Sequence, residues 1–275
     1  MMFFKGKIMQ DASFLQNKEK LFFDQNGIYL FNDSVLNQKA LPHNAVDLFI
    51  TSPPYNVGID YASNNDAFDY QQYLNFCTTF LQNCFLWAKD GARFCLNIPL
   101  DKNKGGQQSV GADLTTIAKK IGWQYHSTII WNEGNISRRT AWGSWLSASA
   151  PYVIAPVELI VVLYKNKWKK QHKGESDIAK EDFLRWTNGL WTFNGESKKR
   201  IGHPAPFPRE LPRRCIQLFS FVKDCVCDPF SGSGTTMIES ALNDRTFLGL
   251  ELDSGYCALS KNRFLQTIQN EKGLF

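Results

Sequence analysis

Two short motifs combine residue types that could bind a ligand at the end of a strand. The first is Ser52-Pro53-Pro54-Tyr55, which follows the apolar run Val46–Ile50. Prolines fix the backbone and remove two N–H donors, so a hydroxyl, an outward carbonyl and an aromatic ring are held together. Such a set can grip a planar ring that bears an amino group, although an isolated tetrapeptide of this kind can also be an ordinary turn.

The second motif runs from Asp228 to Thr236 and reads DPFSGSGTT, between a short apolar strand and a predicted helix. Its glycines permit a tight turn against a ligand, and N–H groups at a helix start favour an anionic group. It lacks the Gly-Lys-Ser/Thr ending of a P-loop, which disfavours nucleoside triphosphates. Glu251 follows the next strand, about 20 residues beyond the glycine turn, where an acid suits a ribose diol.

The elements that must position these motifs alternate between strand and helix. Short apolar runs, each followed by a polar turn, predict strands at Gly27–Phe31, Val46–Ile50, Ala92–Ile98, Ser127–Trp131, Glu158–Tyr164, Cys225–Cys227 and Thr246–Leu250. Apolar residues at helical spacing predict helices at Gln71–Ala88, Asp113–Ile121, Pro208–Phe221, Thr235–Asn243 and Ser254–Ile268. This alternation predicts a doubly wound α/β sheet with ligands at the carboxyl ends of its strands.

One segment departs from this pattern. Residues 165–202 contain ten Lys or Arg and five Asp or Glu, an excess of +5 that equals the net charge of the whole chain. Trp168, Trp186, Trp191 and Phe193 are interleaved with these charges. The segment is either a solvated insertion or a small target-recognition region that contacts nucleic acid. Residues 1–164 and 203–275 are then expected to form the catalytic and cofactor-binding domain.

Cysteine usage and the termini narrow the class of protein further. The seven cysteines form no CxxC pair and most lie in apolar runs, which predicts reduced, buried thiols and no metal site. Met1–Gln10 is too short and too mixed for a signal peptide, and no run approaches the roughly 18 apolar residues of a membrane span. A cytoplasmic protein without a membrane partner is expected.

Taken together, the two motifs resemble those of the DNA amino-methyltransferases that modify adenine N6 or cytosine N4. Ser52-Pro53-Pro54-Tyr55 resembles the catalytic motif and Asp228–Thr236 the cofactor loop, and their order is that of the permuted beta group. The likeness covers roughly residues 25 to 265 and implies a mostly parallel seven-stranded sheet of the permuted methyltransferase fold. Its implied cofactor, S-adenosyl-L-methionine, would be bound by Asp33, His203, Asp228, Phe230, Gly232, Ser233, Gly234, Thr235, Thr236 and Glu251.

The resemblance also implies a mechanism. The Ser52 side chain and the Pro53 carbonyl would accept hydrogen bonds from the target amino group, so that its lone pair attacks the sulfonium methyl group in line. The base must be flipped out of the duplex, and Tyr55 would stack on it. DNA contacts are expected from Arg138, Arg139, Lys169, Lys170, Lys198, Lys199 and Arg200, with Trp142 and Trp145 near the site. The alternative for Arg138, Arg139, Trp142 and Trp145 is a structured loop with core tryptophans.

Several alternatives remain at this point. Ser at the first motif position leans toward cytosine N4, whereas adenine N6 is the alternative. Methylation at cytosine C5 would need a nucleophilic Cys, and the chain has no Pro-Cys dipeptide. RNA and protein methyltransferases usually place the cofactor loop first, and a non-catalytic DNA-binding module would leave the glycine motif unexplained. Duplex DNA is the expected partner, with a homodimer and a cognate restriction endonuclease as further partners in a restriction-modification system.

Overall fold

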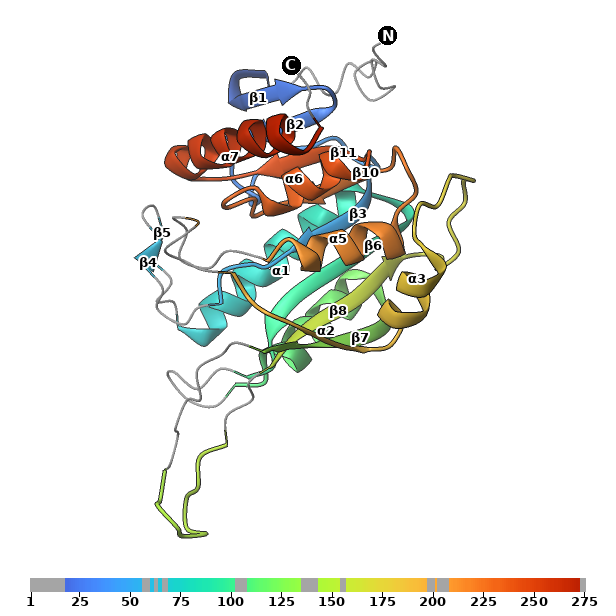
Figure 1. Ribbon diagram of the computed structural model, residues 1–275. Helices are drawn as coiled ribbons and strands as arrows, with labels where there is room; N and C mark the ends of the chain where they lie inside the picture. Colours follow the sequence, from blue (N-terminus) through green and yellow to red (C-terminus); the bar gives the residue numbers. More distant parts are fainter. Residues whose placement is uncertain are drawn as a thin grey trace.

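The computed structural model of the chain (Figure 1) describes residues 18–55, 60–61, 64–65, 69–101, 108–134, 143–153, 157–196, 201 and 208–272. Its centre is a nine-stranded sheet in the order β1-β2-β11-β10-β3-β6-β8-β7-β9. The strands are β1 (Leu21–Gln25), β2 (Ile28–Phe31), β3 (Val46–Thr51), β6 (Ala88–Pro99), β7 (Trp123–Glu133), β8 (Val157–Lys165), β9 (Leu190–Phe193), β10 (Cys225–Asp228) and β11 (Thr246–Leu250). A separate hairpin joins β4 (Asp60–Tyr61) to β5 (Asn64–Asn65).

Most strands of the sheet run in one direction. β2, β11, β10, β3 and β6 are parallel to their neighbours in that series, and β9 is parallel to β7. Only β1 and β8 run the opposite way within the nine-stranded sheet. The predicted doubly wound, mostly parallel sheet is confirmed, but the expected seven strands were two too few, because β1 and β9 extend its two edges.

Helices cover both faces of the sheet (Figure 1). On one face, α1 (Tyr70–Trp87) and α2 (Val110–Ile121) bury Phe80 and Leu114 against the strands. The other face is covered by α3 (Lys180–Trp186), α5 (Glu210–Phe219), α6 (Thr235–Leu242) and α7 (Ser254–Lys272). Because both faces are covered, all residues of β3 and β10 are buried, as expected for central parallel strands.

The segment that the sequence set apart, residues 165–202, shares the main sheet and core over its described part. Trp186 and Trp191 are buried, and β9 pairs with β7. Trp168 stacks on His126 with ring centroids 3.6 Å apart. Trp168, Trp186 and Trp191 therefore pack within the protein, whereas Phe183 is exposed, and a role of the segment in target recognition stays a prediction.

Two further expectations concern the cysteines and the membrane. All seven cysteines are buried free thiols, as predicted. Within the described ranges, no helix combines the length and the apolar character that crossing a bilayer would require.

Candidate active site

The two sequence motifs lie side by side at the carboxyl ends of neighbouring strands. β10 pairs with β3 in parallel, with Val226 opposite Leu48. The hydroxyl of Thr51, one residue before the Pro-Pro turn, donates a hydrogen bond of 2.7 Å to Asp228 Oδ1. The structure therefore brings together two turns that lie 177 positions apart in the chain.

Asp228 is a buried cross-link between these turns. Its Oδ2 accepts a 2.8 Å hydrogen bond from the Thr236 hydroxyl, and the Phe230 N–H donates to its Oδ1 at 3.1 Å. Burial raises the pKa of Asp228 to about 7, although these hydrogen bonds favour the ionised carboxylate. The sequence assigned Asp228 to the cofactor, but its side chain is buried at 2% exposure among the groups that donate to it, so we infer that it positions one turn against the other.

The glycine turn adopts a backbone that glycine alone takes up readily. Gly232 has a φ of 50° and Gly234 a φ of 77°, and a Cβ at Gly234 would lie 2.9 Å from the Ser260 side chain. From α7, Ser260 Oγ donates to the Gly232 carbonyl at 2.7 Å and Arg263 donates to the Ser233 carbonyl. Because α7 holds these carbonyls, the path of the turn into α6 is fixed.

Glu251 and Asp33 lie at the ends of adjacent strands. β11 pairs with β2 in parallel, and Asn32 Nδ2 donates to the Glu251 carbonyl at 3.0 Å. The Glu251 carboxylate accepts from the N–H groups of Gly232 at 2.8 Å and Asp253 at 2.9 Å. Burial raises the pKa of Glu251, while the bonds from backbone N–H groups oppose that rise. The acid at the strand end is thus tied to the glycine turn.

The remaining cofactor-binding predictions surround the same turn or fall outside the described residues. Phe230 is partly exposed, and its ring meets Phe80 edge-on with centroids 5.3 Å apart. Ser233, Thr235 and Thr236 are buried at the start of α6. His203 lies outside the described residues.

The Pro-Pro turn belongs to a polar network that the sequence did not predict. Ser52 Oγ donates to Tyr55 Oη at 2.6 Å, and Tyr55 Oη donates to Glu158 Oε2 at 3.0 Å. Asn97 Nδ2 donates to Tyr55 Oη at 2.9 Å and to Glu158 Oε2 at 2.5 Å. Asn97 lies near the end of β6 and Glu158 near the start of β8, so three strands meet at this network.

Glu158 is the only carboxylate whose hydrogen bonds to this network are described. Burial raises its pKa, the hydrogen bonds from Asn97 and Tyr55 lower it, and the charge of Glu133 raises it further. Pro53 is buried and Pro54 is partly buried, which keeps the turn rigid beside the network. The arrangement offers hydrogen-bond acceptors and an aromatic ring at one place.

Few of the predicted DNA contacts can be placed. Arg138, Arg139, Trp142, Lys198, Lys199 and Arg200 lie outside the described residues. Lys169 is exposed just after β8, at the ends of the strands that lie away from the two motifs. The prediction for Lys170 is corrected: its side chain is 8% exposed and its ammonium group pairs with Asp224 at 2.9 Å, so it is not available to a phosphate. Trp145 is exposed on a hairpin between β7 and β8.

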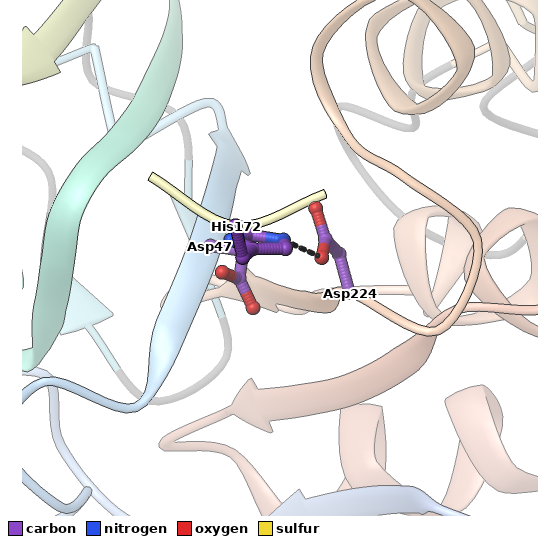
Figure 2. Close-up of side chains that lie close together, drawn as sticks. All are labelled: Asp47, His172 and Asp224. Atoms are coloured by element: carbon purple, nitrogen blue, oxygen red, sulfur yellow. Dashed lines mark hydrogen bonds and ion pairs between the residues drawn. The ribbon is translucent and has the colours of Figure 1, made fainter. Parts of the chain in front are cut away.

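A second polar cluster lies at the other end of the strands, away from the two motifs. Figure 2 shows Asp47, His172 and Asp224 together, with candidate ligand atoms that all lie within 4.8 Å of one another. Lys89 Nζ, however, lies 2.6 Å from Asp47 and Lys170 Nζ lies 2.9 Å from Asp224. Two ammonium groups therefore already neutralise the carboxylates that a cation would need. The absence of a metal site stays a prediction, and this cluster is best explained as an ion-pair network.

Comparison with known proteins agrees with this geometry. The profile of the DNA methylase family matches residues 46–262. The chain is 60% identical to the type II methyltransferase M.MjaVI of Methanocaldococcus jannaschii over 182 aligned residues. The alignment covers 66% of this chain and 93% of M.MjaVI. It is also 25% identical over 261 residues to the type II methyltransferase M.ScaI of Streptomyces caespitosus, covering 89% of this chain and 83% of the relative.

The chain therefore belongs to the N4-cytosine/N6-adenine DNA methyltransferase family. Among solved structures, it resembles TTHA0409 of Thermus thermophilus, provisionally named a DNA modification methylase and solved with S-adenosyl-L-methionine. That likeness has a TM-score of 0.68 at 28% identity and covers 87% of this chain and 93% of TTHA0409. The cytosine-N4-specific PvuII DNA methyltransferase shares the fold, with a TM-score of 0.67 at 20% identity over 86% of each chain.

Proposed function

We propose that the chain transfers a methyl group from S-adenosyl-L-methionine to N4 of cytosine in duplex DNA. One observation carries this proposal: the Thr51–Asp228 hydrogen bond of 2.7 Å joins the Pro-Pro turn to the glycine turn. A site that accepts hydrogen bonds from an amino group therefore lies beside a turn suited to a cofactor. Methyl transfer needs these two partners in one place.

The residues around the glycine turn fit S-adenosyl-L-methionine. The Glu251 carboxylate accepts backbone hydrogen bonds from Gly232 and Asp253, and because a carboxylate has about four lone-pair sites, it can still accept one from a ribose hydroxyl. Gly232 and Gly234 let the backbone approach a ligand closely, and Phe230 offers a partly exposed ring. When bound, the cofactor supplies a methyl group on a sulfonium. Asp33, at the neighbouring strand end, is assigned to the adenine side by the family resemblance.

The residues of the Pro-Pro turn would act on the base. The exocyclic nitrogen is a poor nucleophile because its lone pair is delocalised into the ring. The Ser52 oxygen and the Pro53 carbonyl would each accept one N–H, which draws the lone pair out of conjugation. Tyr55 would stack on the flipped base and help to offset the roughly few kcal/mol that unstacking costs.

The choice of cytosine rests on Ser52. A serine hydroxyl in the first position of the motif favours cytosine N4 by family resemblance, whereas an aspartate favours adenine N6. N6 of adenine is the alternative target, because both bases place a ring nitrogen beside the amino group. The fold and the cross-linked turns are compatible with either base.

The exposed hairpin 143–153 is a second candidate DNA contact. It lies between β7 and β8 and projects away from the sheet in Figure 1. Four apolar side chains are exposed on it: Trp145, Leu146, Tyr152 and Val153. Exposed aromatic rings stack on bases, so we expect Trp145→Ala to weaken DNA binding in a gel-shift titration and to leave cofactor affinity unchanged. Equal DNA affinity would remove the hairpin from the interface.

The biological setting is proposed from the named relatives. M.MjaVI and M.ScaI are both named type II methyltransferases. We therefore propose a role in a restriction-modification system, with duplex DNA as substrate, a cognate endonuclease as functional partner and a homodimer as the assembly. Sedimentation of the purified chain tests the dimer, and digestion of its methylated DNA tests the protection.

The function is tested on DNA from cells that express the chain. Mass spectrometry of nucleosides is expected to find N4-methylcytosine, and sequencing of the modified bases gives the recognition site. A Ser52→Ala variant is the matched control and is expected to lose most of the modification. N6-methyladenine instead would overturn the choice of base, and unmodified DNA in the presence of folded protein that binds the cofactor would overturn the function.

A further inference from the structure

The hydrogen bonds around Tyr55 form a directed chain that ends on Glu158. A carboxylate can only accept hydrogen bonds, so Tyr55 Oη must donate its single hydrogen across the 3.0 Å contact with Glu158 Oε2. Having given that hydrogen away, the Tyr55 oxygen is an acceptor toward Ser52, 2.6 Å distant. Ser52 therefore donates its own hydrogen to Tyr55.

The contacts of Asn97 agree with this direction. Its amide nitrogen carries two hydrogens and no lone pair that accepts, and it lies 2.9 Å from Tyr55 Oη and 2.5 Å from Glu158 Oε2. Both oxygens must accept from it. Glu158 Oε2 thus receives two donors, as an ionised carboxylate does, and Tyr55 Oη receives hydrogens from Asn97 and Ser52.

We propose that Glu158, acting through Tyr55, holds the Ser52 hydroxyl as a hydrogen-bond acceptor for the amino group of the target base. A free serine hydroxyl can present either its hydrogen or its lone pairs. With its hydrogen directed to Tyr55, the Ser52 oxygen presents only lone pairs to a bound amino group. This inference rests on the proposed function and adds two positioning residues to it, Glu158 and Asn97.

The same chain gives Tyr55 a second role. Its ring can stack on the base, while its hydroxyl transmits the acceptor character of Glu158 to Ser52. The two roles separate experimentally, because Tyr55→Phe keeps the ring and removes only the hydroxyl. A tyrosine that only stacked would tolerate this change.

The proposal predicts a pH effect with a defined sign. A protonated Glu158 would donate to Tyr55, whose hydrogen would then turn to Ser52, and the Ser52 hydrogen would point at the base. The rate should therefore fall as the pH drops through the raised pKa of Glu158. Among the described residues, the titratable groups that bear on Glu158 are Tyr55 and Glu133 of β7, and β6 contributes the non-titrating amide of Asn97.

The test compares single-turnover methylation rates of the full chain at saturating DNA and S-adenosyl-L-methionine. Tyr55→Phe and Glu158→Leu remove the hydroxyl or the terminal acceptor, and each is expected to slow transfer about tenfold or more by misdirecting Ser52. Glu158→Gln keeps an acceptor oxygen but cannot be protonated. It should stay within about threefold of the wild-type rate near neutral pH and should lose the decline at acid pH.

Matched controls separate this inference from folding and from the proposed function. Tyr125→Phe and Glu181→Leu change exposed residues of the same types elsewhere and should leave the rate unchanged. Calorimetric affinity for S-adenosyl-L-methionine should be equal in all variants, which shows that each has folded. Wild-type rates in Tyr55→Phe or Glu158→Leu, or a Glu158→Gln variant as slow as Glu158→Leu, would overturn the inference. Retained activity in Ser52→Ala would instead overturn the proposed role of Ser52 itself.

Discussion

A buried aspartate stands at each end of β10, and the two have opposite surroundings. Asp224, just before the strand, is 7% exposed and contacts Lys170 and His172. Asp228, its last residue, is 2% exposed and accepts from two hydroxyl groups and one backbone N–H. β10 thus has an ion pair at its amino end, away from the site. At its carboxyl end, at the site itself, it has hydrogen bonds from uncharged donors.

The two carboxyl groups titrate in opposite directions as a result. Burial alone would raise the pKa of Asp224, but the Lys170 ammonium and the hydrogen bonds around it hold that pKa below its ordinary value. At Asp228, the burial effect prevails and the pKa is about 7. The comparison shows that a buried counter-charge keeps the pKa of Asp224 low, whereas the uncharged donors around Asp228 do not offset the effect of burial.

We expect the largest effects on the free energy of unfolding when the carboxylates at the two ends of β10 are removed in turn. Asp224→Ala leaves the Lys170 ammonium buried without its partner and is expected to lower the free energy of unfolding by about 3–5 kcal/mol. Asp228→Ala leaves only neutral donors unsatisfied and should cost about 1–3 kcal/mol. Urea denaturation near neutral pH measures both.

A double variant checks the cause of that loss. If the unpaired ammonium is responsible, Asp224→Ala combined with Lys170→Met should recover a large part of the stability that Asp224→Ala alone loses. A double variant as unstable as the single variant would show that the backbone contacts of Asp224, such as its bond from the Phe221 N–H, matter more than the charge.

The pH dependence of stability should sharpen the comparison at the site end. The folded-state pKa of Asp228 is raised from 3.8 to about 7, so its contribution to stability is complete below about pH 4 and is lost as the pH rises through about 7. Asp228→Asn cannot titrate. Between about pH 4 and pH 8, the wild type should therefore lose about 2–4 kcal/mol relative to this variant. Parallel stability profiles for the two proteins would contradict the raised pKa.

The smallest effect is expected at His172. Its side chain is 46% exposed beside Asp224, so His172→Ala should change the free energy of unfolding by less than about 1 kcal/mol. Because Lys89 and Lys170 already neutralise the two carboxylates, added Zn²⁺ should leave the melting temperature of both proteins unchanged. A rise that depends on His172 would show that Asp47, His172 and Asp224 bind a metal ion.

The order of strands and helices could be predicted because each element depends on its local sequence. Each of the seven predicted strands and five predicted helices overlaps an element of the structure, since central parallel strands form apolar runs. β9 was missed because its four residues, Leu190–Phe193, lie within a segment whose charges dominate its composition. β1 was missed as a short edge strand with mixed burial.

The residues of the candidate site could be predicted only in part from the sequence, because the direction of one strand could not be predicted. The two motifs carry their own turn chemistry, so Ser52, Tyr55 and the glycine turn could be found. Glu158 could not, because ligand-binding residues are expected after the strands of a parallel sheet, and Glu158 lies at the start of a strand. β8 runs antiparallel to β6. The start of β8 therefore lies at the site, and its last residue, Lys165, lies at the far ends of the strands. No local pattern in the sequence reveals that reversal.

The position of β10 and β11 has a consequence for biosynthesis. β10 and β11 insert between β2 and β3, which lie much earlier in the sequence, so the centre of the sheet stays open until β10 and β11 have been made. A ribosome-bound chain without β10 leaves the edge of β3 unpaired and exposes it to other unfinished chains. Pairing of β10 and β11 therefore also brings the glycine turn to the Pro-Pro turn, and a product that stops before β10 lacks one of the two turns of the candidate site.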